Sequence, residues 1–425
     1  MIAALLGLAQ AMTAAPAPPP CTLCDAERLR PFLEKLAHAR RDARTVRILQ
    51  LGDSHTAGDQ VTGAWRAALQ TRYGDAGRGV LAPGRPYQGY LTRNVTAAQS
   101  PGWSVAGIFG ATYSSAGTTP VGLSNFSLTT VADGATLSIA ADRTAFDRFT
   151  VCALAQPGGG TLTLRIGTAS EAMPLDGDRI EPRCHAVDTQ GPAYGASLTA
   201  GGGPVTITSM ATERVGAAGV ELSNLGTVGA QMMHMEREDD RLVAAEVAQY
   251  RPDLLVVAFG TNEAYVPRFS AAEYEARLRG GLARLRRLLP GVPTLILGAP
   301  DSATKLPALQ AGSWGSSAPC VIDTAAPPPF APPPLLAAPA AADWRPTAAL
   351  PLVQAIQRRV AHATGAAFWD WGMAMGGRCT ATRWALGAAP LMRPDRVHFS
   401  TAGGVEIARL LQADLDAAAA NLGIR

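Results

Sequence analysis

VRILQLGDSHTAGDQV, residues 46–61, is the stretch that decides the fold. It begins as a short apolar run rich in β-branched residues, which is typical of a strand buried on both faces. Gly52-Asp53-Ser54 then interrupts the run, and from Asp59 the apolar residues recur with helical spacing. We therefore expect Ser54 in a tight strand-to-helix turn, where a serine can serve as a nucleophile beside free helix N–H groups or simply as a helix cap.

The composition is that of a large globular protein. The chain has 425 residues, 47% of them apolar, which predicts two or three domains. Its 37 basic and 34 acidic residues are well mixed, so neither a nucleic acid nor a membrane surface is expected as a partner. No stretch after the N-terminus is long and apolar enough to predict a transmembrane segment. The sequence does not indicate an oligomeric state.

Residues 1–20 are expected to be an export signal. They consist of an apolar segment of signal-peptide length followed by small residues and a proline run, although a positively charged n-region is missing. The alternative is a disordered Ala/Pro tail. The expected location is therefore periplasmic or extracellular, a compartment in which disulfides persist.

The six cysteines are an even number, which is compatible with disulfides. Cys21 and Cys24 form a CxxC with no second CxxC or histidine pair nearby, so a zinc site is not expected. A thioredoxin-like site is not expected either, because this CxxC precedes the first strand. From the expected domains, the other four could pair as Cys152–Cys184 and Cys320–Cys379, although four cysteines allow three connectivities.

Two kinds of pattern divide the rest of the chain. Residues 86–223 carry short alternating runs between Gly, Pro and Asp turns, the last run at 217–223, and predict an inserted all-β sandwich domain. Residues 21–85 and 224–425 alternate helical patterns with short apolar strands. They predict an α/β fold in which helices cover both faces of a mostly parallel sheet.

Two irregular segments interrupt this pattern. Residues 74–84 are expected to be a glycine-rich loop; no helix follows their formal GxGxxA, so a dinucleotide site is not expected. Residues 301–346 form a long Pro/Ala/Ser-rich connection, which is either a functional loop or partly disordered.

Polar residues that suit acyl transfer lie at the ends of the predicted strands. In open α/β sheets ligands bind beyond the carboxyl ends of the strands, where we expect Ser54 and Asn262. Asp395 precedes His398 by three residues, just before the last helix. His398 would act as general base toward Ser54 while Asp395 fixes its tautomer, although a simple helix cap is the alternative for this pair. Donors to the oxyanion would be the Ser54 N–H, the Asn262 amide and an N–H from residues 224–231.

Taken in order, these blocks resemble those of the GDSL/SGNH hydrolases. The blocks are Gly52-Asp53-Ser54, a glycine within 224–229, Gly260-Thr-Asn262 and Asp395-x-x-His398. The resemblance implies an SGNH-hydrolase, flavodoxin-like three-layer sandwich with no metal or organic cofactor. It also implies a triad of Ser54, Asp395 and His398 and an oxyanion hole formed by Ser54, Gly229 and Asn262. Gly226 is the alternative donor, but the spacing from Asn224 favours Gly229.

Within this family, GDSHTAGD, GTNE, FWDW, DRVHFS and the inserted β region resemble a bacterial branch that includes peptidoglycan O-acetylesterases. The resemblance implies a serine esterase that removes O-acetyl groups from a cell-wall or other polysaccharide, with peptidoglycan favoured. Alternatives are a polysaccharide O-acetyltransferase or a lipid or aryl esterase on the same triad, and, in another class, a non-catalytic glycan-binding protein.

Two residues depart from the family pattern. His55 follows the serine in place of Leu, and Glu263 replaces a frequent Asp. His55 could contact substrate, but we expect it to pack behind the turn. Trp369 and Trp371 are expected in the core, not on a sugar-binding surface.

Overall fold

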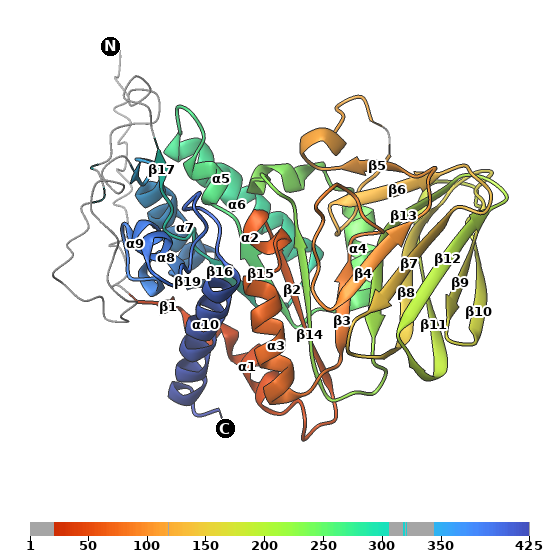
Figure 1. Ribbon diagram of the computed structural model, residues 1–425, viewed down its shortest axis with the longest axis horizontal. Helices are drawn as coiled ribbons and strands as arrows, with labels where there is room; N and C mark the ends of the chain where they lie inside the picture. The colour runs from red at the N-terminus through yellow and green to blue at the C-terminus, as the bar shows by residue number, and fades with distance from the viewer. Residues whose placement is uncertain (1–20, 118, 306–317, 319, 321–343, 425) are drawn as a thin grey trace, which may run out of the picture.

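The computed structural model describes residues 21–117, 119–305, 318, 320 and 344–424. The expected export signal at 1–20 and most of the 301–346 connection lie outside these residues. The described chain forms an α/β part and a β part, which lie side by side (Figure 1).

A six-stranded sheet forms the centre of the α/β part, in the order β1-β19-β16-β15-β2-β14. Every neighbouring pair in it is parallel except the edge pair of β1 and β19. The strands are β1 (Leu23–Cys24), β2 (Thr45–Gly52), β14 (Gly219–Gly226), β15 (Leu254–Ala258), β16 (Thr294–Leu297) and β19 (Ala367–Trp369). The parallel sheet of the sequence-based prediction is thus present.

Helices cover both faces of this sheet because alternate strand residues point to opposite sides. In β2, Ile48 packs with α1 (Arg30–Ala37), α3 (Val61–Tyr73) and α10 (Thr401–Asn421). Leu49 packs on the other side, with α4 (Asp240–Tyr250), α6 (Ala271–Leu288) and α7 (Leu350–Thr364). A strand buried on both faces explains the near-continuous apolar run of residues 46–51.

The β part consists of two antiparallel sheets around a core of its own. One sheet has the order β10-β9-β12-β7-β4, and the other has the order β11-β8-β13-β6-β5, with β3 also paired to β13. The bounds are β3 (Gly77–Leu81), β4 (Val95–Gln99), β5 (Ser104–Gly107), β6 (Phe126–Thr130), β7 (Thr136–Ala141), β8 (Phe146–Ala155), β9 (Thr161–Ile166), β10 (Ala169–Pro174), β11 (Glu181–Ala193), β12 (Gly195–Gly201) and β13 (Val205–Glu213). These sheets agree with the prediction of an inserted β unit.

Two strands differ from the prediction. The run at 217–223, expected in the sandwich, becomes β14 and pairs in parallel with β2, because its residues are buried on both faces as in the other core strands. The segment 74–84, expected to be a loop, contains β3, which pairs with β13. Gly77 and Gly79 adopt positive φ values of 124° and 77°, which a glycine tolerates in an irregular strand.

Three disulfides are present, Cys21–Cys24, Cys152–Cys184 and Cys320–Cys379, so both pairings suggested from the sequence are confirmed. Trp369 and Trp371 are buried in the core, as expected. Among the helices of the described ranges, none has both the length and the apolar character needed to cross a bilayer.

Candidate active site

Ser54 is the first residue of the short helix α2 (Ser54–Ala57), which follows β2 directly. Asp53 caps this helix through a 2.9 Å hydrogen bond from the His55 N–H to its Oδ1. Gly52 is required for the sharp turn, since a Cβ at this position would lie 2.6 Å from the carbonyl oxygen of Ala258 on β15. The strand-to-helix turn predicted from the sequence is therefore present, and the chain forms it around a glycine.

A chain of hydrogen bonds joins Ser54 to two residues from the other end of the sequence. The Oγ of Ser54 lies 2.9 Å from Nε2 of His398, and Nδ1 of His398 lies 2.9 Å from Oδ2 of Asp395. Asp395 and His398 lie in the loop before α10, and the Asp395 Oδ1 accepts hydrogen bonds from the N–H groups of Val397 and His398. The fold thus brings together the three residues expected to form a triad.

The surroundings of Asp395 favour its ionised form. Partial burial works against the charge, but hydrogen bonds from the His398 ring and from the His398 and Val397 N–H groups outweigh it and hold the pKa of Asp395 well below its usual range. The carboxylate is therefore negative whenever His398 needs an acceptor for its Nδ1–H.

The two expected oxyanion segments follow the strands on either side of β2. In the sheet, Gly52 of β2 pairs with Gly226 of β14 and with Ala258 of β15, so all three strands end at the same level. Gly229 lies in the loop after β14 with a φ of 79°. Asn262 lies on α5 (Thr261–Ala264), and its Nδ2 donates a 2.9 Å hydrogen bond to the carbonyl oxygen of Ala230.

Glu263 joins these two segments, a role that the sequence did not indicate. Its buried carboxylate accepts 2.9 Å hydrogen bonds from the N–H of Gly260 and from the N–H of Met232. Burial raises its pKa to about 7 despite these hydrogen bonds. Glu263 therefore fixes the distance between the Gly229 loop and the Asn262 helix.

His55 lies behind the nucleophile turn, as expected. Its ring is buried and contacts Asp53 and the backbone of Val397.

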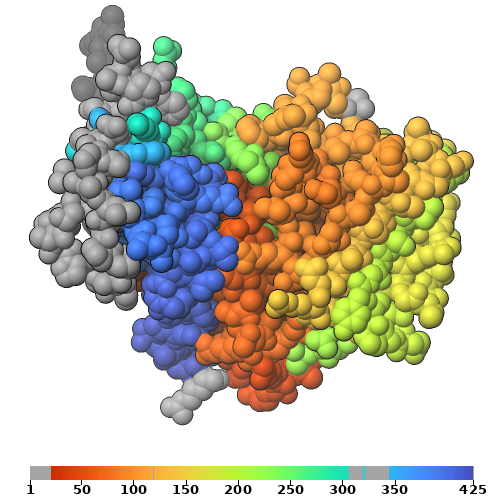
Figure 2. Space-filling view, in the orientation of Figure 1, coloured from red at the N-terminus to blue at the C-terminus, as the bar shows by residue number. Residues whose placement is uncertain are grey.

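A cavity of about 250 Å³ opens beside Ser54 and His398. Three of its lining residues, Tyr87, Gly89 and Leu91, come from the segment between β3 and β4, and the others include Gln60, Val228 and Arg393. The segments that line it, coloured red, orange, green and blue, meet near the centre of the face shown in Figure 2. No local pattern marked residues 87–91 as part of the site.

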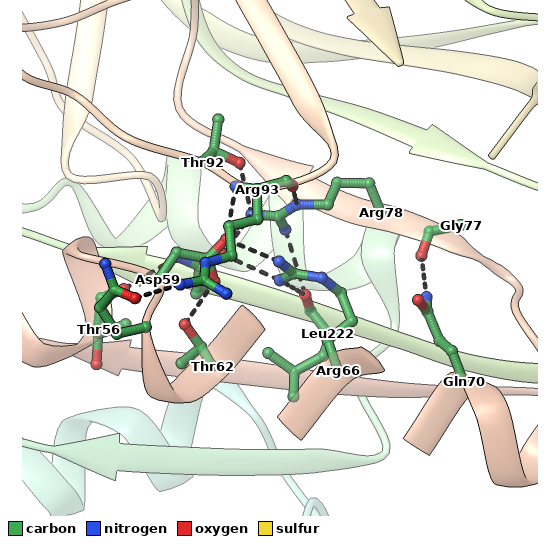
Figure 3. Close-up of polar contacts among 12 residues, drawn as sticks. Thr56, Asp59, Thr62, Arg66, Gln70, Gly77, Arg78, Thr92, Arg93 and Leu222 are labelled. Carbon is green, nitrogen blue, oxygen red and sulfur yellow. Dashed lines mark hydrogen bonds and ion pairs between the residues drawn. The ribbon is translucent and has the colours of Figure 1, made fainter. Parts of the chain in front are cut away.

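A buried polar network holds this lining segment against the nucleophile turn (Figure 3). Asp59 Oδ2 accepts 2.7 Å hydrogen bonds from the N–H of Arg93 and from Nη2 of Arg66. Arg78 of β3 donates to the Arg93 carbonyl oxygen at 3.1 Å and to Thr92 Oγ1 at 2.7 Å. Burial, with the nearby Arg66 charge, lowers the pKa of Arg78 to about 9, and the Asp59 charge opposes this shift. Asp59 thus links the segment after Ser54 to the entry of the β part.

The described residues contain no group of three or more His, Cys, Asp or Glu side chains arranged to hold a metal ion.

Comparison with known proteins gives one family and several related structures. The model of the GDSL-like lipase/acylhydrolase family matches residues 193–404, which include Asn262, Asp395 and His398 and begin after Ser54. No curated protein matches the chain.

Among solved structures, a peptidoglycan O-acetylesterase is 26% identical, with a TM-score of 0.69, over 91% of this chain and 95% of that chain. A Bacillus subtilis protein is 11% identical over 80% of this chain and 98% of its own, with a TM-score of 0.34. A family two carbohydrate esterase from Clostridium thermocellum, in complex with cellohexaose, is 10% identical over 76% of this chain and 100% of its own, with a TM-score of 0.28. The chain belongs to the GDSL-like lipase/acylhydrolase family and is a carboxylic ester hydrolase with an SGNH-hydrolase core and additional antiparallel β-sheets.

Proposed function

We propose that this protein is an exported serine esterase that removes O-acetyl groups from a bacterial polysaccharide, with peptidoglycan as the favoured substrate. The observation that carries the proposal is the continuous hydrogen-bonded chain from Asp395 through His398 to Ser54, with 2.9 Å at each step.

In the proposed mechanism, Ser54 Oγ attacks the acetyl carbonyl carbon while Nε2 of His398 takes the hydroxyl proton. Asp395 accepts a hydrogen bond from the Nδ1–H of His398 and stabilises the imidazolium that forms. The N–H groups of Ser54 and Gly229 and the Asn262 amide would bind the oxyanion. His398 then returns the proton to the departing sugar oxygen.

Water completes the cycle. It attacks the acetylated Ser54 with His398 again acting as base, and acetate leaves as the serine hydroxyl is restored. Each of these steps uses groups of the chain itself and requires no cofactor.

The residues that line the cavity are consistent with the proposal of a large acetylated substrate. Tyr87 and Leu91 come from the segment that leads into the β part, so a glycan in the cavity would also lie next to that part. In this proposal the α/β part, which includes β14, forms the catalytic core, and the β part, which includes β3, positions the glycan. Peptidoglycan is favoured because the esterase of similar structure is a peptidoglycan O-acetylesterase. The three disulfides support an exported protein, since disulfides persist in oxidising compartments.

The test is acetate release by wild type and by Ser54→Ala from O-acetylated peptidoglycan, acetylated xylan and a nitrophenyl acetate. Ser170→Ala is the matched control, because Ser170 is an exposed serine on β10 of the β part. We expect Ser54→Ala to lose at least about 10³-fold in kcat on every ester that wild type cleaves, and to keep its unfolding temperature. Activity of Ser54→Ala near that of wild type would contradict the mechanism. Activity confined to xylan or to the small ester would contradict the peptidoglycan assignment.

A further inference from the structure

His55 lies directly beneath the proposed general base. His55 is only 6% exposed, and the centroid of its ring lies 5.5 Å from that of the His398 ring. Trp371 and Phe399 pack against the same ring at 5.6 Å. The His55 ring is therefore kept in one orientation and away from bulk solvent.

Both nitrogens of the His55 ring face hydrogen-bond acceptors. Nδ1 lies 3.1 Å from Oδ1 of Asp53, and Nε2 lies 2.9 Å from the carbonyl oxygen of Val397. A neutral imidazole donates from one nitrogen only, so a ring that donates to a carboxylate and a carbonyl together is an imidazolium. Burial lowers the pKa of His55, but the Asp53 charge and hydrogen bond and the Val397 carbonyl outweigh this and raise it overall.

We propose that Asp53 and His55 form a positioning pair for His398, an inference that rests on the proposed triad. The His55 ring holds the carbonyl of the residue before His398, which fixes the loop that carries the base. The positive ring also cancels the negative charge of Asp53, so that the pair behind His398 is neutral overall. In this inference His55 is a positioning residue that acts through His398, although the residue also lines the cavity beside Ser54.

The other charged groups near the pair are few. The loop with His398 contributes Asp395, which is hydrogen-bonded to the base itself. From α5, the Thr261 hydroxyl lies 3.5 Å from His55 Nδ1, and Glu263 interacts with the Asp53 charge. Trp371 and Phe399, whose rings pack against His55, are uncharged. Arg393, in the same loop as His398, donates its N–H to the carbonyl oxygen of His398 and lines the cavity together with His55 and His398. His55 is the cation within hydrogen-bond distance of Asp53, at 3.1 Å.

Removing the positive charge should change the pH dependence of the enzyme. A neutral side chain at position 55 leaves the Asp53 carboxylate uncompensated near His398, which favours the protonated and inactive base. The acid limb of the kcat/KM profile then moves to higher pH. A unit charge at about 5–10 Å, at an effective dielectric constant of about 20, shifts such a midpoint by roughly 1–2.5 pH units.

The experiment compares the acid limb of wild type with those of His55→Gln, His55→Asn, Asp53→Asn and Asp53→Asn/His55→Gln. The substrate is a nitrophenyl acetate, read at the isosbestic wavelength of nitrophenol. The two His55 variants are both neutral, but glutamine can extend its amide to Val397 and asparagine cannot. We therefore expect both to move the limb upward, and we expect His55→Asn to have the lower kcat at its optimum.

Two variants test the charge argument. In Asp53→Asn the helix cap is kept, since Asn caps well, and His55 can become neutral, so the limb should stay within about 0.3 pH units of wild type. The double variant carries no charge at either position and should bring the limb back toward wild type. His185→Gln is the matched control, because His185 also pairs with a carboxylate, Glu171 at 2.7 Å, on the exposed surface of the β part. It should leave the limb unchanged.

An unshifted limb in a folded His55→Gln enzyme, or equal shifts in the single and double variants, would overturn the inference. If a His55 variant unfolds, the comparison of Asp53→Asn with the double variant still decides it, since equal limbs are then expected. Failure of the proposed function is distinct from either result. It would show as wild-type hydrolysis that does not depend on Ser54.

Discussion

Replacing Gly229 by alanine tests the proposed oxyanion hole at one atom. Gly229 has a φ of 79°, and an added Cβ would lie 2.7 Å from Cε1 of Phe109. Phe109 cannot easily withdraw, because its ring stacks on His234 with centroids 4.4 Å apart. The loop that carries the Gly229 N–H must therefore move.

The expected loss of stability in Gly229→Ala has two contributions. A left-handed conformation costs an alanine about 1 kcal/mol relative to glycine. The close contact with Phe109 adds about 1–3 kcal/mol, as is usual when a packed site receives an extra methyl group. Complete loss of one oxyanion donor lowers kcat by about 10²–10³. We expect Gly229→Ala to lose about 2–4 kcal/mol of stability and at least about tenfold in kcat, with a smaller change in KM.

The assay is nitrophenyl acetate hydrolysis together with denaturant unfolding. Gly216→Ala is the matched control, since its φ is 69° and no atom of the described chain lies within 4 Å of the added Cβ. It should lose about 1 kcal/mol and keep its kcat. Phe109→Leu combined with Gly229→Ala should recover part of the activity. If Gly229→Ala loses the expected stability but keeps a wild-type kcat, Gly229 is not a donor, and the alternative at Gly226 must be tested.

Two further predictions concern stability. Glu221 shares Arg47 with Glu213, and burial raises its pKa to about 8 against the opposing charge of Arg47. Because this pKa is raised in the folded state, the contribution of Glu221 to stability is complete below its unfolded pKa and is lost as the pH rises through about 8. In urea unfolding, the unfolding free energy of Glu221→Gln relative to that of wild type should therefore rise by on the order of 2 kcal/mol as the pH is raised from 5 to 8. A difference that does not change with pH would contradict this. Cys320 and Cys379 close a loop with a sequence separation of 59, and replacing both by serine should cost about 2–4 kcal/mol of unfolding free energy, so that a loss below about 1 kcal/mol would argue against a structural role.

The sequence predicted the elements whose signals are local. The strand and turn around Ser54 carry an apolar run and a glycine, and both occur in the structure. Asp395 and His398 are three residues apart before a helix, and the fold brings them to Ser54. Core strands buried on both faces were recognisable for the same reason, since their apolar residues are continuous.

Features that depend on distant partners could not be predicted. β3 is glycine-rich, and its strand conformation depends on β13, which lies more than a hundred residues further along the chain. β14 looked like a sandwich strand, because its pairing with β2 is not encoded in its own residues. The bond from His55 to Val397 spans 342 positions. Such contacts are set by packing, and a single sequence carries no periodicity for them.

The network around Asp59 limits how far the β part can be exchanged or removed without affecting the α/β part. Arg78, in the first strand of the β part, has its acceptors on Thr92, Arg93 and the β14 residues Leu222 and Asn224, and Asp59 binds Arg93 in turn. A chimera that joined this insert to another hydrolase, or a core from which it was excised, would remove part of the acceptors of the buried Arg78 guanidinium. The insert is therefore not an interchangeable accessory. Evolution or engineering has to alter the wall of the catalytic cavity and the β part together.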